Sequence, residues 1–156
     1  MTKEEFMREA IRLSIVNVES GKGGPFGAIV VKDGRIIARG TNQVTALHDP
    51  TAHAEVIAIR NACRELESFQ LEGCELYTSC EPCPMCLGAI YWARPAKVYF
   101  ANTQRDAAAI GFDDQHIYEE LALPHNQRRL PQEQLLADEA LEAFALWQKI
   151  ENKTPY

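Results

Sequence analysis

The sequence predicts an α/β protein in which helices cover both faces of a β-sheet. From residue 73 onward, segments with strand character alternate with helical segments, which favours parallel strands joined by right-handed crossovers. Closer to the amino terminus, Phe26–Lys32 is apolar throughout, as expected of a strand covered on both faces. In such sheets ligands bind beyond the strand ends, where helices begin, and we expect a site there.

Helix and turn signals along the chain place the individual elements. The predicted elements are a helix to about Ser20, strands 26–32 and 35–40, a helix starting at Pro50, strand 74–78, helix 84–93, strand 97–101, helix 115–121 and a last helix capped by Asp138. Thr2 with Glu5 forms a capping box, and Asp33-Gly34 is a hairpin turn. The segments 42–48 and 106–113 are predicted loops, and 129–134 is either irregular or an edge strand.

Apolar residues at helical spacing predict the buried side of each helix. In the first helix these residues are Phe6, Met7, Ala10, Ile11, Leu13 and Val18. In the second they are Val56, Ile59, Cys63 and Leu66, and in the last Leu141, Phe144 and Trp147.

Length, charge and cysteine content limit the class of protein. The 156 residues suit one domain, expected to span 1–156 without a linker. A net charge of −6 argues against nucleic-acid binding and favours a small neutral or cationic substrate. The charged amino terminus and the lack of a long apolar run argue against a secretion signal or membrane span, so we expect a cytosolic protein. Five cysteines, three of them clustered, favour a reducing compartment and a metal over disulfides.

Residues 77–95 hold the strongest chemical signal, YTSCEPCPMCLGAIYWARP. Cys83 and Cys86 are three residues apart, so on a helix both sulfurs lie on one side and can reach one metal ion. Pro84 suits the first helical position, because its missing N–H would have no partner there. The positive end of this helix favours thiolates, the form of cysteine that binds zinc.

A third ligand is expected, because only one Cys-x-x-Cys pair is used and catalytic zinc sites combine three protein ligands with an open position. His53 is the expected third ligand, and His48 is the other histidine close enough in sequence to compete. Glu55 is expected as a buried carboxylate beside the metal, the alternative being a solvated helix carboxylate. Cys80 also has Cys-x-x-Cys spacing to Cys83, but it precedes the helix, so we expect a packed thiol.

The segments His53-Ala54-Glu55 and Pro82–Cys86 match the H-x-E…P-C-x-x-C signature of zinc-dependent nucleobase deaminases. Together with GGPFGA at 23–28 and GFDD at 111–114, they make the chain resemble the cytidine/deoxycytidylate deaminase superfamily, and over nearly its full length the bacterial guanine deaminases within it. The resemblance implies zinc-dependent hydrolysis of guanine, a small purine base, to xanthine and ammonia, in purine catabolism or salvage.

The resemblance further implies a three-layer α/β/α fold with a five-stranded mixed sheet, and a site in which one zinc ion is held by His53, Cys83 and Cys86. Glu55 would be the proton shuttle, and the implied substrate contacts are Asn42 on the purine, Asp114 at the ring edge, and Phe26 and Trp92 as aromatic walls. In the implied homodimer the carboxyl-terminal segment crosses to the partner, where Tyr156 closes the pocket. Without the resemblance, Asp114 would more commonly cap helix 115–121, and the aromatic residues would be packing.

Two other kinds of function stay open from the sequence. One is a different deaminase of the same superfamily, acting on tRNA adenosine, cytosine or another amino-heterocycle; the acidic composition weighs against the tRNA substrate. The other is a zinc-stabilised binding module without turnover. Glu55 argues against that module, because a purely structural zinc has no use for an unliganded carboxylate.

Overall fold

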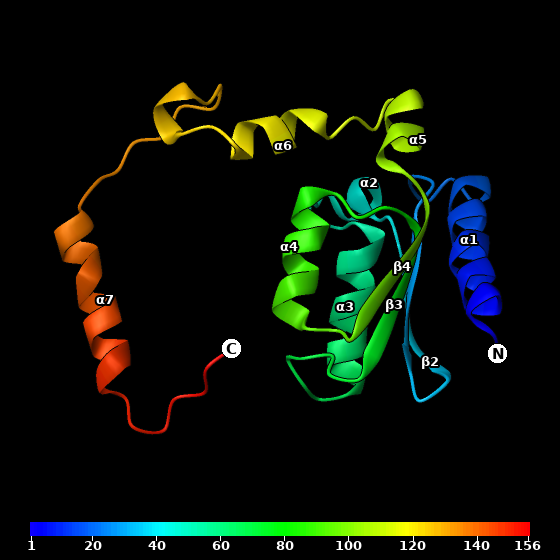
Figure 1. Ribbon diagram of the computed structural model, residues 1–156, viewed down its shortest axis with the longest axis horizontal. Coiled ribbons are helices and arrows are strands. Elements are labelled where there is room, and N and C mark those ends of the chain that lie inside the picture. Colours follow the sequence, from blue (N-terminus) through cyan, green and yellow to red (C-terminus); the bar gives the residue numbers. More distant parts are fainter. The chain divides into compact units, whose positions relative to one another are not determined.

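The computed structural model describes residues 1–156, and the chain divides into two compact units, Met1–Asp114 and Gln115–Tyr156 (Figure 1). The first unit contains strands β1 (Gly27–Lys32), β2 (Arg35–Thr41), β3 (Cys74–Cys80) and β4 (Lys97–Asn102). Its helices are α1 (Lys3–Glu19), α2 (Val44–Leu47), α3 (Ala54–Glu65), α4 (Pro84–Ala93) and α5 (Gln104–Ala109). The second unit contains α6 (Gln115–Leu121), the 3-10 turn His125–Gln127 and α7 (Ala137–Lys149).

The sheet is mixed and has four strands in the order β2-β1-β3-β4. β1 is antiparallel to β2 and β3, and β3 is parallel to β4, which confirms the predicted hairpin and the predicted crossover. The prediction of five strands is wrong, since 129–134 is irregular. Pro131 in this segment cannot donate to a ladder, and the preceding Arg128 turns the chain back by donating to the carbonyls of Glu120 and Leu123.

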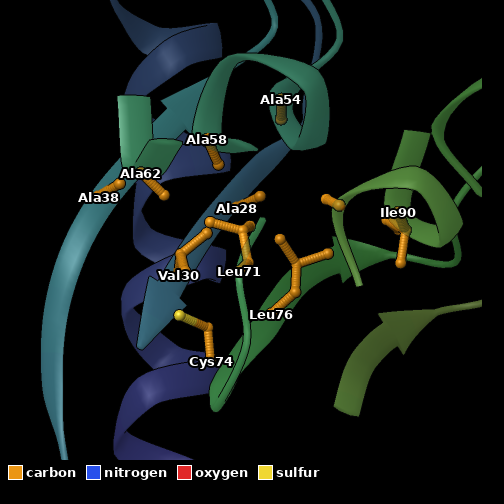
Figure 2. Packing of buried hydrophobic residues seen from close by; sticks show 11 residues of the cluster. Ala28, Val30, Ala38, Ala54, Ala58, Ala62, Leu71, Cys74, Leu76 and Ile90 are labelled. Carbon is orange, nitrogen blue, oxygen red and sulfur yellow. The ribbon is translucent and has the colours of Figure 1, made fainter. Parts of the chain in front are cut away.

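Helices cover both faces of this sheet, as predicted for an α/β protein. Alternate residues of β1 face opposite layers: Ile29 and Val31 pack in one cluster with residues of α1, and Ala28 and Val30 in another with residues of α3 and α4. Figure 2 shows the second cluster, where Ala54, Ala58 and Ala62 of α3 lie beside the strands. The small alanines let α3 approach the sheet closely.

The position of α3 depends on Gly40 in β2. A Cβ at this residue would lie 2.2 Å from the carbonyl oxygen of Ala54 and 2.5 Å from the nitrogen of Ala58. Only glycine therefore allows the first turn of α3 to rest on β2. Because His53 and Glu55 flank Ala54, this backbone contact also sets where both candidate site residues stand.

The predicted start of this helix at Pro50 is wrong, because α3 begins at Ala54 with His53 as its N-cap. The Asp49 carboxylate accepts hydrogen bonds from the backbone and the hydroxyl of Thr51 and so closes a local turn in place of a helix cap. The buried residues of α3 are Ala54, Glu55, Ala58 and Ala62, whereas the predicted Ile59, Cys63 and Leu66 are partly buried at the edge of the core.

The buried side predicted for α1 is confirmed in part, because Phe6 and Ala10 are buried and Met7 and Leu13 are partly buried against the core. Its buried residues are Phe6, Ala10, Ser14 and Asn17, and Val18 is exposed. The predicted loop 42–48 contains the short helix α2, and the short helix α5 extends into the predicted loop 106–113. The helix α7 begins after Leu136, ahead of the predicted cap Asp138. The bounds predicted for 84–93 and 115–121 are those of α4 and α6.

Candidate active site

His53 stands at the amino end of α3 with an extended backbone, φ −72° and ψ 156°. A residue in this position usually caps the helix with its side chain, but the imidazole of His53 makes no capping hydrogen bond. Its Nδ1 instead lies 3.5 Å from the sulfur of Cys83 and 3.4 Å from the sulfur of Cys86. The cap position therefore aims the ring at the start of a second helix.

That second helix, α4, presents both cysteines from its first turn. Cys83 is the N-cap, Pro84 follows at the first helical position as predicted, and the sulfur of Cys83 accepts a hydrogen bond from the backbone nitrogen of Cys86 at 3.5 Å. Cys86 is fully buried beneath this turn. The same geometry that caps α4 thus places two sulfurs side by side.

One nitrogen and two sulfurs converge here, all within 4.8 Å of one another. Ligands of a single tetrahedral zinc ion, with Zn–N near 2.0 Å and Zn–S near 2.3 Å, lie roughly 3.6 Å apart. The imidazole-to-sulfur separations agree with this spacing. A histidine and two cysteines are also a donor set that zinc prefers, so the residues fit this metal and leave its fourth position to a non-protein ligand.

Cys83 and Cys86 each shift the pKa of the other thiol. Hydrogen bonding from Cys86 lowers the pKa of Cys83 to about 4, assisted by His53. The hydrogen bond with Cys83, together with burial, raises the pKa of Cys86. A hydrogen bond with Cys83 raises the pKa of His53. A divalent cation would replace this sharing of protons, because it favours the thiolate form of both cysteines and the neutral imidazole.

Glu55 lies in the first turn of α3 and is only 6% exposed. Its Oε2 accepts a hydrogen bond from the Cys86 thiol at 3.4 Å, and its Oε1 accepts one from the Thr78 hydroxyl at 3.3 Å. Burial raises the pKa of this carboxyl group. A buried carboxyl group with a raised pKa beside a metal site is suited to accept and return protons, which agrees with the expected burial of Glu55.

The predicted substrate residues Phe26 and Asn42 are neighbours, because the backbone nitrogen of Asn42 donates to the carbonyl of Phe26 at 3.2 Å. The backbone beside them is held by Asn17 of α1, a buried residue that sequence reasoning missed. Its side-chain amide donates to the carbonyls of Gly24 at 2.8 Å and Asn42 at 3.0 Å. The available signal was an asparagine at a buried-side position of an amphipathic helix.

Asp114 is half-buried at the end of the first unit. The hydrogen bond with Cys83 raises the pKa of His53 and burial raises the pKa of Cys80, and the charge of Asp114 adds a smaller contribution to both. The structure thus places Asp114 within electrostatic reach of the candidate metal site. The Gln104 side chain donates to its Oδ1 at 3.4 Å. Two residues earlier, Phe112 meets Phe26 edge to face with ring centroids 5.0 Å apart, so the segment 112–114 carries an aromatic contact that the sequence did not reveal.

Comparison with known proteins agrees with this arrangement of ligands. Residues 1–102 match the family described as the cytidine and deoxycytidylate deaminase zinc-binding region. The chain is also 54% identical to a guanine deaminase from Bacillus subtilis (strain 168) over 156 residues, covering 100% of each protein. The chain belongs to the zinc-binding cytidine and deoxycytidylate deaminase family.

Two further comparisons place this deaminase within the family. The X-ray structure of the Bacillus subtilis guanine deaminase superposes with a TM-score of 0.98, covering 100% of this chain and 99% of that one. A tRNA-specific adenosine deaminase from Aquifex aeolicus is 50% identical over 101 residues, which are 65% of this chain and 66% of that protein. The similarity to the tRNA enzyme therefore covers only part of the chain, whereas the similarity to the guanine enzyme covers its full length.

Two residues named for the substrate pocket of this deaminase have exposed side chains. Trp92 is 62% exposed and lies six residues beyond Cys86 in α4, about 9 Å along the helix axis. Tyr156 belongs to the second unit and is 71% exposed. Their roles as pocket walls stay predictions.

The other candidate ligands lie apart from this cluster in the deaminase. His48 is an exposed residue in left-handed conformation at the end of α2. Cys80 is buried, its thiol faces the carbonyl of Thr103 at 3.8 Å, and burial raises its pKa to about 11. An unionised thiol in a packed position does not compete for a cation.

No helix of the chain has the length and apolar character needed to cross a bilayer.

Proposed function

We propose that this protein is a zinc-dependent guanine deaminase, which hydrolyses guanine to xanthine and ammonia. The observation that carries the deaminase chemistry is the buried Glu55 carboxylate beside three converging ligand atoms. The choice of guanine is supported by similarity to a guanine deaminase along the entire chain.

His53 Nδ1 and the sulfurs of Cys83 and Cys86 are the proposed zinc ligands. A zinc ion with an open position generates a nucleophile from water at neutral pH. The protein contributes rigidity, because one ligand caps α3 and the other two lie in the first turn of α4. Both helices contribute residues to the same hydrophobic core, so the ligand atoms keep their spacing without the metal having to draw them together.

Glu55 is the proposed proton shuttle. Deamination requires that a proton leaves the attacking water, that a ring nitrogen gains a proton, and that the departing amine leaves as ammonia. One carboxyl group can carry these protons in turn if it is held close to the reacting atoms. The burial of Glu55 raises its pKa and so makes the protonated state accessible during turnover.

Asp114 is proposed to recognise the purine by accepting hydrogen bonds from one edge of the ring. Guanine presents two donors there, N1–H and the exocyclic amine, and a carboxylate can accept from both. Adenine has a bare N1 acceptor and would leave the carboxylate unpaired, at a cost of about 1–3 kcal/mol. Gln104 donates to Asp114 from one side and so restricts its orientation.

Asn42 and Phe26 are proposed to hold the base from the opposite side. They are linked by a backbone hydrogen bond, and Asn17 holds the carbonyl of Asn42 and that of Gly24, to which Phe26 donates, so they form a rigid wall. Phe26 offers a ring for stacking, and its contact with Phe112 connects this wall to the segment that carries Asp114.

Ammonia release from a panel of substrates tests the proposal. Purified protein with measured zinc content is supplied separately with guanine, guanosine, adenine, cytosine, an amino-triazine and an anticodon stem-loop. The expected result is rapid release from guanine and slow release from the other substrates. Turnover of the stem-loop alone would favour the tRNA deaminase alternative, which the net charge of −6 already weighs against. The lack of any turnover with full zinc would favour a zinc-stabilised binding module.

We also propose a homodimer in which the second unit covers a partner. α7 has no buried residue, and its apolar side chains Leu141, Phe144, Leu146 and Trp147 are exposed, Phe144 by 72%. In the first unit α4 likewise exposes Leu87, Tyr91 and Trp92. Apolar surface of this extent on two separate elements favours contact with a second copy. Light scattering should give a dimer for the wild type and a monomer for Phe144→Asp, with Glu142→Lys on the same helix remaining dimeric.

Subunit complementation tests whether Tyr156 acts on the partner's site. Co-expressed Glu55→Gln and a chain ending at Pro155 would each be inactive alone. If the tail works in the partner, the mixed dimer has one complete site, with Glu55 from one chain and Tyr156 from the other, and activity returns. A tail that works on its own chain gives no recovery.

Location in the cytosol is proposed as well, because five free cysteines suit a reducing compartment, and cell fractionation tests it.

A further inference from the structure

Thr78 is a buried polar residue at the edge of the apolar core. It lies in the central strand β3, paired with Ala28 of β1 and Phe100 of β4, and is 1% exposed. Alternation along β3 places Thr78 on the same face as Leu76, which packs in the cluster beneath α3 and α4. A hydroxyl group in this position carries a desolvation cost unless hydrogen bonds offset it.

Two acceptors surround the Thr78 hydroxyl. Its Oγ1 is 3.1 Å from the carbonyl oxygen of Cys80 and 3.3 Å from Oε1 of Glu55. A hydroxyl has a single hydrogen to donate, so the two contacts are alternatives for that hydrogen. The carbonyl alone would satisfy the hydroxyl, and the carboxyl group of Glu55 is therefore a second partner that the fold supplies in addition.

We propose that Thr78 is a positioning residue that holds Oε1 of Glu55, so that Oε2 faces the metal site. This inference rests on the proposed role of Glu55 as proton shuttle. Oε2 is the oxygen beside Cys86, at 3.4 Å from its sulfur. With Oε1 held by a strand in the middle of the sheet, the carboxyl group loses the freedom to rotate about its last bond, and the same oxygen meets each successive proton.

The hydroxyl suits this role because Oε1 can accept its hydrogen in both protonation states of the carboxyl group. When Glu55 is ionised, Thr78 donates its hydrogen to Oε1. When Oε2 takes up a proton, Oε1 becomes a carbonyl oxygen and still accepts the same hydrogen from Thr78. The Thr78 hydrogen stays on Oγ1 in both arrangements, so the contact persists through the shuttle cycle without proton transfer to Thr78.

Kinetics of Thr78→Val and Thr78→Ser test the proposal. Valine keeps the shape and removes the hydroxyl, whereas serine keeps the hydroxyl and removes the methyl group. We expect valine to lower kcat for guanine on the order of 10- to 100-fold, the range for a lost hydrogen bond to a charged group, with KM and zinc content within about twofold of wild type. Serine should restore most of kcat. Unchanged kcat in the valine variant, or an equal loss in the serine variant, overturns the proposal.

A double-mutant cycle that combines Thr78→Val with Glu55→Gln distinguishes positioning of Glu55 from a general structural effect. If Thr78 acts through Glu55, adding Thr78→Val to Glu55→Gln lowers the residual turnover no further, whereas independent losses that multiply contradict the proposal. If the valine variant does not fold, Thr78→Ala replaces it in the same comparison.

A crystal structure of the valine variant tests the positioning role of Thr78 without a measurement of activity. It should show the Glu55 carboxyl group rotated or in several conformers with the backbone of α3 unmoved; an unchanged single conformer refutes the positioning role. Wild-type protein that does not deaminate guanine would instead refute the proposed function, so the two failures are distinguishable.

Discussion

Replacing Gly40 by alanine should disturb both the fold and the metal site through one contact. The added Cβ would lie 2.2 Å from the carbonyl oxygen of Ala54 and 2.5 Å from the nitrogen of Ala58. Both are backbone atoms near the start of α3, so no side-chain rotation can relieve the overlap. Either the helix or strand β2 has to move.

The size of that movement follows from the overlap. Ordinary contact begins near 3.4 Å, so the separation between Cβ and the Ala54 oxygen must grow by about 1.2 Å. Overpacking of this kind costs about 2–3 kcal/mol of unfolding free energy, or roughly 5–10 °C in Tm for a chain of this length. Metal–ligand distances tolerate only about 0.2 Å. Because Ala54 lies between His53 and Glu55, zinc affinity should fall on the order of 10-fold or more.

Thermal unfolding, zinc retained after dialysis against a weak chelator, and guanine turnover measure the three effects. Gly88→Ala is the matched control, because nothing lies within 4 Å of a Cβ there and the residue is inside helix α4. Alanine at this position should stabilise the protein by about 0.5–1 kcal/mol and leave zinc affinity unchanged. A Gly40→Ala variant with wild-type Tm, zinc affinity and turnover would refute the reasoning.

Two other predictions follow from single side chains. Asp114→Ala should lower kcat/KM for guanine on the order of 10- to 100-fold with zinc content unchanged, and loss of zinc in parallel with activity would contradict its role in reading the base. Hydrogen bonds from Arg12 and Arg39 lower the pKa of Glu9 to about 2 from its usual 4.5, so ionised Glu9 stabilises the folded state fully above about pH 4.5, and this contribution is lost as the pH falls towards 2. Wild type should therefore be more stable than Glu9→Gln near neutral pH and approach it in acid; a difference in unfolding free energy that does not change with pH counts against this.

Local sequence signals predicted the parts of the fold that depend on neighbouring residues. The hairpin at Asp33-Gly34 and the helix from Pro84 to Ala93 are governed by turn and cap chemistry within a few positions. The ligand trio was predictable for the same reason, since two of its members share one helical turn. Asp49 shows the limit of such signals, because its carboxylate has a nearby alternative partner in Thr51 and closes a turn there, five residues before the helix begins.

Residues whose environment is made by distant segments could not be predicted. The Asn17 side chain can be buried because the carbonyls of Gly24 and Asn42, from two distant loops, accept hydrogen bonds from its amide. Thr78 resembles any other strand residue until α3 brings Glu55 to it from 23 positions away. The number of strands was likewise not determined locally: 129–134 has the length of a strand, but Arg128 ties its start to α6. Tertiary hydrogen bonds decided each of these cases.

Glu55→Gln tests the central claim most directly, because glutamine keeps the size of the side chain and an oxygen for the Thr78 hydroxyl but cannot accept a proton. Zinc content and the rate of xanthine formation are measured on the same sample. The structure predicts one zinc per chain in both proteins and a rate that falls about 10²- to 10⁴-fold in the variant. A variant that keeps zinc and forms xanthine at nearly the wild-type rate would contradict the assignment of this site as a deaminase centre.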